Sequence, residues 1–273
     1  MTIPIRILYD EYGRTGNRFL AYLEPIAWAI CKKKKVIILF PENILKHYDY
    51  FRSSPYISLP LWGKGKMTWR VARKLFLYNK LAQSFYKTKL SRKLGFYAEW
   101  VNNILQEPHE YWPKVKPQIQ ELFTPNDNIK KPIDATFAKV HKGGTKIIGV
   151  HIRREDFKTA YGGIYYYEDD VFIGYMQQIQ LLVPGCKFCI ASNESVSPRY
   201  AELFDIIVNP IPNAAGDLYA LSRCDYIIGP PSTYNCWASF IGDVPLFSMK
   251  QGNLTINLTD FQVYRDEDYK NNR

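Results

Sequence analysis

Two adjacent arginines follow an apolar segment in the second half of this chain of 273 residues. The apolar run at 147–150 predicts a buried strand, and His151, Arg153 and Arg154 come at its end. Open α/β sheets bind ligands beyond the carboxyl ends of their strands. Arginine keeps its charge, and its planar donor fork matches phosphate oxygens. The pair therefore indicates an anion site with a diphosphate as the simplest ligand, while a surface pair bonded to nearby carboxylates is the alternative.

A glycine-containing loop lies between the first expected strand, 3–9, and the first expected helix, 17–31. It holds Gly13, Gly16, Asn17 and Arg18. Glycine lets the backbone come close to a ligand, and the N–H groups at a helix start attract anions. An ordinary turn between a strand and a helix would explain the loop as well. Because the loop matches neither the P-loop pattern nor G-x-G-x-x-G, a nicotinamide cofactor is poorly supported.

Further polar residues lie near the ends of other expected strands, on the same sheet edge as the arginines. Asn193 follows strand 187–191, and Ser232 and Thr233 follow strand 226–228 at a helix start. The two hydroxyl residues could cap that helix or give donors to a phosphate. Asp217 lies in the preceding helix, where an acid could complement the helix dipole or accept hydrogen bonds from a guanine edge.

Expected strands and helices alternate at short intervals, which is typical of a parallel α/β sheet. In the second half we expect strands at 147–152, 187–191, 206–208, 226–228 and 244–247. Helices are expected between them at 171–182, 197–203, 214–223 and 233–241. The first half opens with strand 3–9, helix 17–31 and strand 36–40, which form a βαβ unit. The pattern predicts an α/β fold with two Rossmann-like domains facing a cleft, at 1–143 and 144–260, and a polar tail at 261–273.

Composition places the chain among globular proteins. Hydrophobic residues make up 47% of it, and no apolar run approaches the ~20 residues that a membrane-spanning helix needs. The N-terminus has no secretory signal pattern, so we expect a cytoplasmic protein. Cys186 and Cys189 have a spacing that puts them on opposite faces of a strand, and no second Cys/His pair completes a zinc site. We therefore expect reduced cysteines and no bound metal.

The net charge of +10 originates in one stretch of the sequence. Residues 50–98 contain eleven Lys or Arg and no acid. Apolar residues recur in this stretch at helical spacing, namely Val71, Leu75, Tyr78, Ala82 and Phe85. We expect one basic amphipathic helix that packs this apolar face on the N-terminal domain. The alternative is that the stretch faces an anionic surface, so peripheral contact with an anionic membrane stays open.

Together these segments resemble the α1,2/α1,6/protein-O-fucosyltransferase superfamily. That family carries an H-x-R-R-x-D-like motif, a D-x-x-x-L-S-x-C-D-like helix and a Ser-rich turn. The matching segments here are the loop 13–18, the motif 151–156, the helix 217–225 and the turn 229–235. The turn reads S-T-Y-N-C-W rather than the S-S-x-S-x-W of the α1,2 branch, and the motif ends E-D-F rather than G-D-Y. The resemblance is clearest at 1–40 and 147–241.

The resemblance implies a GT-B fold and inverting transfer of fucose from GDP-fucose, with no cofactor and no essential metal. Arg153 and Arg154 would hold the diphosphate and stabilise it as it leaves, and Ser232 and Thr233 would bind phosphate oxygens. The domain 144–260 would then bind the nucleotide sugar. The domain 1–143 would bind the acceptor, a glycan or a lipid-linked glycan.

The resemblance also implies which residues contact the rest of the donor. His151 and Asp217 would contact the nucleoside. The further donor-binding residues that it implies are Gly16, Asn17, Arg18 and Asn193.

Inversion needs one base to take the proton of the acceptor hydroxyl. Asp10 and Glu11, at the end of the first strand, are candidates for this catalytic role. Glu155 and Asp156 are others, although Asp156 is better suited to orient the arginines.

Two alternatives stay open on the sequence alone. A glycosyltransferase that uses another nucleotide sugar would share most of these features, and a metal-dependent one would want a D-x-D at a strand end, whereas the D-x-D here lies in the polar tail at 266–268. A non-enzymatic nucleic-acid-binding protein would use the basic stretch and its aromatic residues. Because no RNA- or DNA-binding motif accompanies them, no nucleic-acid partner is expected.

Overall fold

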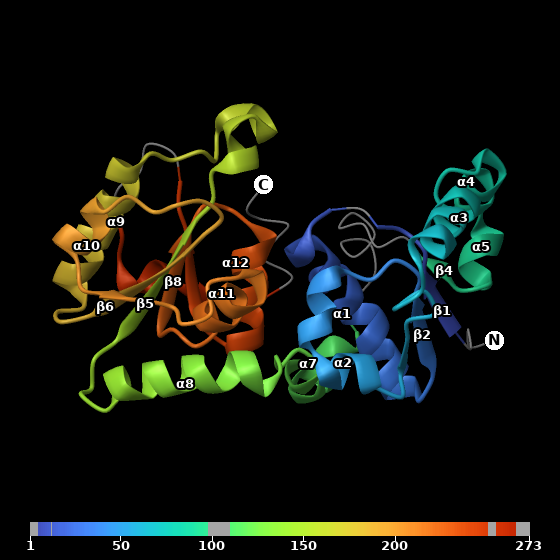
Figure 1. Ribbon diagram of the computed structural model, residues 1–273, viewed down its shortest axis with the longest axis horizontal. Coiled ribbons are helices and arrows are strands. Elements are labelled where there is room, and N and C mark those ends of the chain that lie inside the picture. The colour runs from blue at the N-terminus through green and yellow to red at the C-terminus, as the bar shows by residue number, and fades with distance from the viewer. Residues whose placement is uncertain (1–4, 12, 98–109, 251–254, 266–273) are drawn as a thin grey trace. The chain divides into compact units, whose positions relative to one another are not determined.

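The computed structural model describes residues 5–11, 13–97, 110–250 and 255–265 (Figure 1). The chain forms two compact units, Met1–Thr124 and Pro125–Arg273. The expected boundary was 143, but helix α8 (Asp127–His141) contacts strand β5 (Ile147–Ile152) and so belongs to the second unit. Within the described ranges, no helix has both the length and the apolar character that crossing a membrane would require.

The first unit is built on a parallel sheet of order β3-β2-β1-β4. Its strands are β1 (Ile5–Leu8), β2 (Lys35–Ile38), β3 (Ile57–Ser58) and β4 (Phe96–Tyr97). Its helices are α1 (Thr15–Lys32), α2 (Asp49–Ser53), α3 (Lys66–Phe76), α4 (Lys80–Tyr86), α5 (Lys89–Lys93) and α7 (Lys116–Leu122). Two 3-10 helices, Asn43–His47 and Trp112–Lys114, complete the described elements of this unit. The register pairs Ile5 with Lys35 and Leu8 with Ile38, so the expected βαβ unit is confirmed.

Helix α1 forms the centre of the first unit. Thirteen of its residues are buried, and its Phe19 ring lies 4.8 Å from that of Phe123 and 5.9 Å from that of Tyr48. Its buried Glu24 accepts hydrogen bonds from three successive backbone amides, at 110–112, at 2.8 to 3.1 Å. Since a buried carboxylate needs such partners, Glu24 ties α1 to the segment before α7.

The basic stretch forms three short helices, so the prediction of one continuous helix is wrong. Asn79 caps α4 by accepting hydrogen bonds from the amides of Leu81 and Ala82, so the chain starts a new helix there. Helix α3 packs through Trp69, Ala72 and Phe76. The Trp69 ring meets that of Phe40 edge-on at 5.2 Å. Helix α3 thus turns Trp69 and Phe76 toward the first unit and leaves Val71 and Leu75 exposed.

The second unit has a six-stranded sheet of order β10-β9-β8-β5-β6-β7. Its remaining strands are β6 (Lys187–Ser192), β7 (Ile206–Ile207), β8 (Tyr226–Gly229), β9 (Pro245–Ser248) and β10 (Gln262–Val263). Strands β5 to β9 are parallel, and β10 is antiparallel to β9. The chain runs outward from β5 through β6 to β7 and then returns to place β8 on the other side of β5. The sheet therefore has a topological switch point between β5 and β8, where ligands bind in open α/β sheets.

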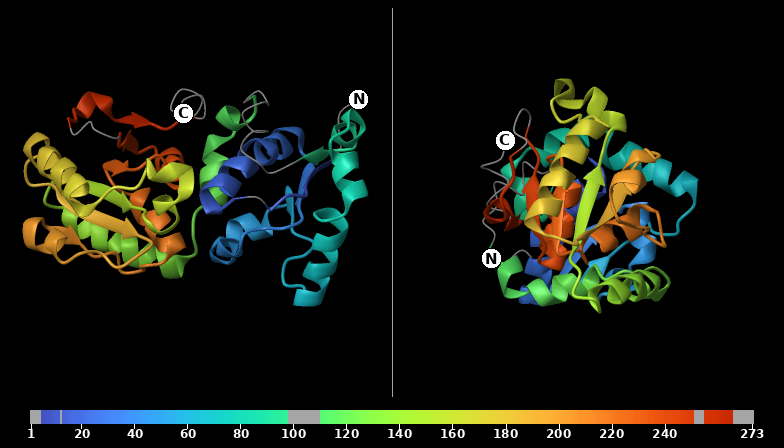
Figure 2. Two further views of the ribbon diagram at one scale, coloured as in Figure 1. Left: turned by 90° about the horizontal axis from the view of Figure 1, so that it is seen from above. Right: turned by 90° about the vertical axis from the view of Figure 1, so that its left-hand side faces the viewer.

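Helices cover both faces of this sheet (Figure 2). They are α8, α9 (Asp169–Leu182), α10 (Arg199–Leu203), α11 (Ala214–Leu221) and α12 (Thr233–Gly242). Three 3-10 helices, Glu155–Lys158, Ala160–Gly163 and Leu258–Asp260, lie in the connections. On one face Ile148, Val150 and Ile152 pack with α9 and α10, and the other face contacts α8, α11 and α12. The expected α/β alternation is confirmed.

The start of the expected polar tail is part of the sheet. Residues 261–265 contain β10 and bury Phe261 and Tyr264. The D-x-D at 266–268 lies outside the described residues. All five cysteines are free thiols, and four of them are buried.

Candidate functional site

His151 is a buried polar residue near the carboxyl end of β5. Its side chain packs against Tyr234, with ring centroids 5.0 Å apart, and its overall exposure is 6%. Burial and the positive charge of Arg153 lower the pKa of His151 to about 4, against the opposing effect of a hydrogen bond with Asn235. His151 is therefore a neutral imidazole near pH 7, able to donate or accept a hydrogen bond but not to supply charge.

Arg153 lies at the switch point between β5 and β8. Its Nε and Nη2 donate to the two carboxylate oxygens of Asp156 at 3.2 and 2.8 Å, and its Nη1 donates to Ser232 Oγ at 3.2 Å. The guanidinium lies over the Phe157 ring at 4.4 Å. One carboxylate therefore balances its charge, while Nη1 points to the turn that begins α12.

Ser232 caps α12, which is one of the two alternatives that the sequence left open. Its hydroxyl accepts a hydrogen bond from the Tyr234 amide at 3.2 Å, and Thr233 is the first residue of the helix. The turn passes very close to β5, since a Cβ on Gly229 would lie 2.9 Å from the His151 carbonyl oxygen. Amide groups at a helix start carry partial positive charge. Together with Arg153, they make this end of α12 favourable for an anion.

Arg154 lies in different surroundings. Its Nε donates to the Tyr167 carbonyl at 3.1 Å, its Nη1 to Glu194 at 3.3 Å, and its Nη2 to Asp169. Its backbone amide donates to Asn193 Oδ1 at 3.3 Å. The side chain is only 11% exposed. All three guanidinium nitrogens thus have protein acceptors, and two of these acceptors are carboxylates. The sequence alone assigns the two arginines the same role, but the structure gives them different partners.

Asp169 shows how tightly Arg154 is held. The Asp169 carboxylate accepts a second hydrogen bond, from the Tyr200 hydroxyl at 2.7 Å. Burial opposes its ionisation, but the hydrogen bonds from Arg154 and Tyr200 outweigh burial and lower the pKa of Asp169 below its ordinary value. The result is an ionised pair that joins the end of β5 to the start of α9.

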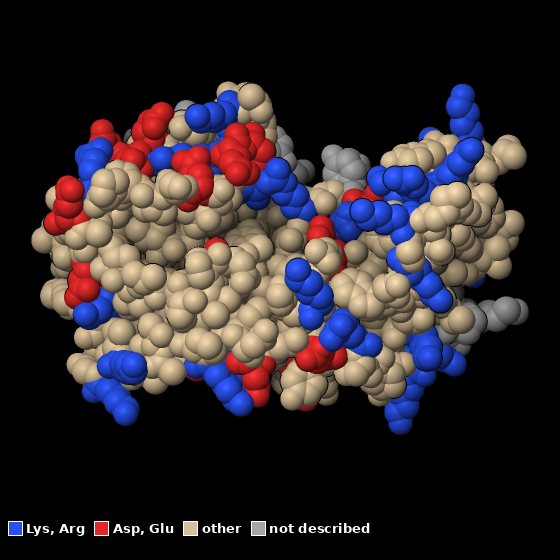
Figure 3. Space-filling model, in the orientation of Figure 1, with Lys and Arg blue, Asp and Glu red and all other residues tan. Residues whose placement is uncertain are grey.

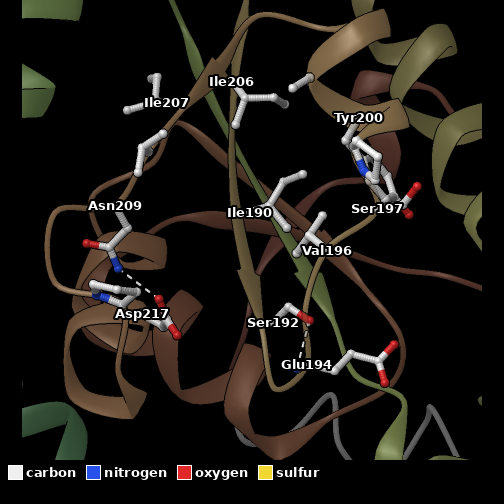
Figure 4. A pocket seen from close by; sticks show the side chains of 14 residues that line it. Ile190, Ser192, Glu194, Val196, Ser197, Tyr200, Ile206, Ile207, Asn209 and Asp217 are labelled. Carbon is white, nitrogen blue, oxygen red and sulfur yellow. Dashed lines mark hydrogen bonds between the residues drawn. The ribbon is translucent and has the colours of Figure 1, made fainter.

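A cavity of about 410 Å³ opens beyond the ends of β6 and β7 (Figure 4). This volume is typical of small-molecule sites. Its apolar lining includes Ile190, Val196, Ile206, Val208 and Pro212. Its polar lining includes Ser192, Glu194, Asn209 and Asp217. An apolar slot with a few polar groups suits a flat base better than a chain of charged groups.

Asp217 is the titratable group of this cavity. Burial raises the pKa of Asp217 to about 6, and a hydrogen bond from Asn209 Nδ2 at 2.8 Å opposes that rise. The cap of α11 is Asn213, whose side chain accepts from the amides of Ala215 and Gly216. Because Asn213 supplies the cap, the Asp217 carboxylate is left to face the cavity. Asn209 was not predicted as a site residue, and its position depends on the hydrogen bond that its Nδ2 donates to the Ile211 carbonyl at 3.1 Å.

The loop 13–18 of the first unit is held by its own contacts. Arg18 is buried and donates to the Phe40 carbonyl at 2.8 Å and to the Glu11 carbonyl, and it pairs with Glu42 at 3.3 Å. Gly13 adopts a left-handed φ of 86°, where a Cβ would clash with Asn17. Arg18 therefore fixes the start of α1 to the end of β2.

The carboxylates expected to act as the base have separate partners. Glu11 pairs with Arg73 of α3. Asp10 Oδ1 accepts a hydrogen bond from the Glu11 amide at 2.7 Å. Asp156 holds Arg153 as described above, whereas Glu155 is exposed at the start of a 3-10 helix. Among the residues that the structure describes, no three His, Cys, Asp or Glu side chains are grouped so that they could hold a metal ion.

Comparison with known proteins places the fold. No family profile and no curated protein matches the sequence. Among solved structures, an Arabidopsis thaliana FUT1 mutant, R284K, in complex with GDP is similar with a TM-score of 0.56 and 13% identity, over 96% of this chain and 74% of that one. The fucosyltransferase NodZ from Bradyrhizobium gives 0.53 and 15%, over 91% and 96%. POFUT1 in its apo form gives 0.51 and 11%, over 89% and 97%. The chain therefore has the GT-B fold of these proteins, as expected.

Proposed function

We propose that this protein is a glycosyltransferase that moves fucose from GDP-fucose to a glycan hydroxyl, with inversion and without a metal. The observation that carries the proposal is the placement of Arg153 beside the start of α12, at the switch point of the second sheet. The fold adds support, because structures of similar proteins contain GDP. One of them is NodZ soaked with GDP-fucose, whose structure is similar to this chain with a TM-score of 0.52.

The cavity beside β6 and β7 is the proposed site of the guanine base. Guanine presents two adjacent N–H donors on one edge, and a carboxylate accepts two parallel hydrogen bonds well. Asp217 offers such a carboxylate at the polar end of an otherwise apolar slot. Uracil has no matching pair of donors, so Asp217 favours GDP over UDP.

Arg153 and the first turn of α12 are the proposed site of the diphosphate. Breaking the bond between sugar and phosphate leaves negative charge on the β-phosphate, and donors fixed at that place stabilise the transition state more than the ground state. Ser232 and Thr233 begin the helix at this point. We assign Arg154 to positioning, because two carboxylates, Asp169 and Glu194, and the Tyr167 carbonyl hold its guanidinium, whereas Arg153 pairs with one carboxylate.

Asp10 is our first candidate for the base that takes the acceptor proton. It is half-buried just beyond β1, at the carboxyl end of the first sheet. Glu155 is exposed and stays the second candidate.

The donor assignment predicts selective stabilisation by guanine nucleotides. GDP or GDP-fucose at 100 times its Kd should raise the free energy of unfolding by about 2.7 kcal/mol, which a thermal-shift measurement would detect. UDP and NAD should leave the midpoint unchanged, and EDTA should not reduce the effect of GDP. Equal stabilisation by UDP-sugars would point to another nucleotide-sugar donor, and loss of binding in EDTA would refute the metal-free proposal.

Asp217 predicts a pH dependence of nucleotide affinity. The carboxyl must be ionised to accept both guanine hydrogen bonds, and its pKa is raised to about 6 in the unliganded protein. Below pH 6 the unliganded protein holds this proton, so binding must include ionisation of Asp217, and the cost of that ionisation grows as pH falls. Affinity for GDP should therefore fall as pH drops through 6, by about tenfold per unit below it, as measured by calorimetry.

A matched pair of variants tests this dependence. Asp217→Asn should bind GDP more weakly at pH 7.5 and should lose most of the pH dependence. Asp205→Asn removes an exposed carboxylate of the same unit, paired with Lys187, and should behave like the wild type. An unchanged pH profile in Asp217→Asn would remove Asp217 from the base site while leaving the phosphate site untouched.

A further inference from the structure

Helix α3 exposes a stripe of apolar side chains. Met67, Val71 and Leu75 are 72%, 47% and 55% exposed. They are spaced four residues apart, so they lie along one side of the helix. The helix already buries Trp69, Ala72 and Phe76 against the first unit. The exposed stripe is therefore a second apolar face, which folding of the unit does not use.

A stripe of cations runs next to the apolar one. Lys66, Arg70 and Lys74 are also four residues apart, each one position before a member of the apolar stripe, and all three are exposed. Arg73, on the same helix, is drawn inward by Glu11 and by the Tyr78 hydroxyl at 2.8 Å. The outward surface of α3 thus consists of two parallel bands, one apolar and one positive.

The neighbouring helices extend both properties. On α4 and α5 the exposed apolar residues include Leu81 and Leu90, at 81% and 57%. The exposed cations of this region are Lys80, Lys87, Lys89, Arg92 and Lys93. Figure 3 shows Lys and Arg side chains over the region of α3 and α4 with uncharged atoms between them. Residues 50–98 contain no acid that could neutralise these charges locally.

We propose that the outer surface of α3, together with α4 and α5, binds the face of an anionic lipid bilayer. The apolar stripe enters the boundary between headgroups and acyl chains, and the cationic stripe stays with the lipid phosphates, which is how interfacial helices bind. Charge complementarity favours an anionic partner. Met, Val and Leu can neither stack on bases nor read hydrogen bonds, so they favour lipid over nucleic acid. This surface shares no residue with the proposed donor site, and the proposal holds or fails independently of that site.

The strength of the effect follows from the number of cations. Each Lys or Arg close to an anionic membrane strengthens binding about fivefold, so removing three should weaken it about 100-fold. The attraction should also weaken steeply as salt shortens the Debye length. The apolar stripe adds a contribution that salt does not screen.

Vesicle sedimentation of the full chain tests the proposal. The wild type should pellet with phosphatidylcholine vesicles that contain phosphatidylserine and not with phosphatidylcholine alone. Replacement of Lys66, Arg70 and Lys74 by Gln should abolish pelleting, and replacement of Met67, Val71 and Leu75 by Ser should reduce it at least as strongly at high salt. The matched control replaces Lys131, Lys139 and Lys142 by Gln, an equal loss of charge from exposed residues at α8, and should pellet like the wild type.

Three results would overturn the proposal. They are no pelleting of the wild type with anionic vesicles at low salt, equal pelleting with neutral lipid, and full pelleting of the Ser variant at every salt concentration. A short RNA that binds the wild type and the Ser variant equally, and that displaces the protein from vesicles, would assign the surface to nucleic acid instead. An unchanged urea-unfolding transition in each variant shows that the fold is intact.

Discussion

Replacing Arg153 by lysine is expected to lower the turnover of the proposed transfer about 100- to 1,000-fold, the usual effect of losing one donor to a developing oxyanion. The Arg153 fork bonds Asp156 with two nitrogens and Ser232 with the third. A lysine ammonium keeps the charge beside Asp156 but cannot span both partners and a phosphate. The fold should therefore survive while catalysis fails. Steady-state release of GDP, together with the thermal midpoint, measures both quantities.

Arg199 provides a matched control for this substitution. It also bonds an aspartate, Asp170 at 2.8 Å, but its side chain is 50% exposed on the short helix α10. Arg199→Lys should keep both turnover and midpoint, because an exposed ion pair contributes little. If Arg153→Lys turned over as fast as Arg199→Lys, Arg153 would not be the phosphate ligand. A large drop in midpoint for Arg153→Lys alone would instead assign it a structural role.

Strand and helix positions in the second unit could be predicted because the signals are local. The apolar run before His151 predicts β5 at the residues where it lies, Ile147–Ile152. The turn residues and the Ser232 cap place the start of α12. Each signal depends on a few neighbouring residues, and together they give the order of elements and hence the fold class. The switch point between β5 and β8 follows from strand order, which the sequence does not state.

Where the predictions from sequence failed, tertiary packing outweighed the local sequence signals. Pro132 lies inside α8. Proline removes one helical hydrogen bond, but Ile129, Ile133 and Phe137 are buried at helical spacing on that helix. Contacts with α11 stabilise the helix in spite of the proline. For the same reason Trp69, rather than Val71, faces the core in α3.

The candidate site was predicted in part. The residues at the strand ends do lie together, because parallel strands bring their carboxyl ends to one edge. The different surroundings of Arg153 and Arg154 could not be predicted, because the partners of Arg154 are distant in sequence. Asp169 and Glu194 lie on different elements, and only the fold brings both to one guanidinium. Adjacent residues of equal chemistry thus acquire different roles through long-range contacts.

Replacing Arg154 by alanine is expected to lower the free energy of unfolding of the second unit by about 3 kcal/mol, the lower end of the range for breaking a buried ion pair. The change leaves Asp169 and Glu194 beside each other without their counter-charge, and it leaves the Tyr167 carbonyl without its donor. The lower end of that range applies because the Asp169 side chain is 23% exposed to solvent. Urea unfolding measures the loss.

The pH dependence of this loss separates the charge effect from lost packing. The pKa of Asp169 is lowered in the folded wild type, so its pairing contributes stability above the pKa of the unfolded state, and that contribution disappears as pH falls through the folded pKa. The difference in free energy of unfolding between the wild type and Arg154→Ala should therefore become smaller toward acid pH. In a double-mutant cycle at neutral pH, Arg154→Ala should cost less in the Asp169→Asn background than in the wild type.

Arg223→Ala is the matched control, since Arg223 pairs with Asp134 at 3.3 Å with its side chain 54% exposed. It should lose no more than about 1 kcal/mol. The contradicting outcome is that Arg154→Ala has the same urea midpoint of unfolding as Arg223→Ala and still loses turnover. In that case Arg154 would contact the donor after its carboxylate partners release it, and the diphosphate would be held by both arginines.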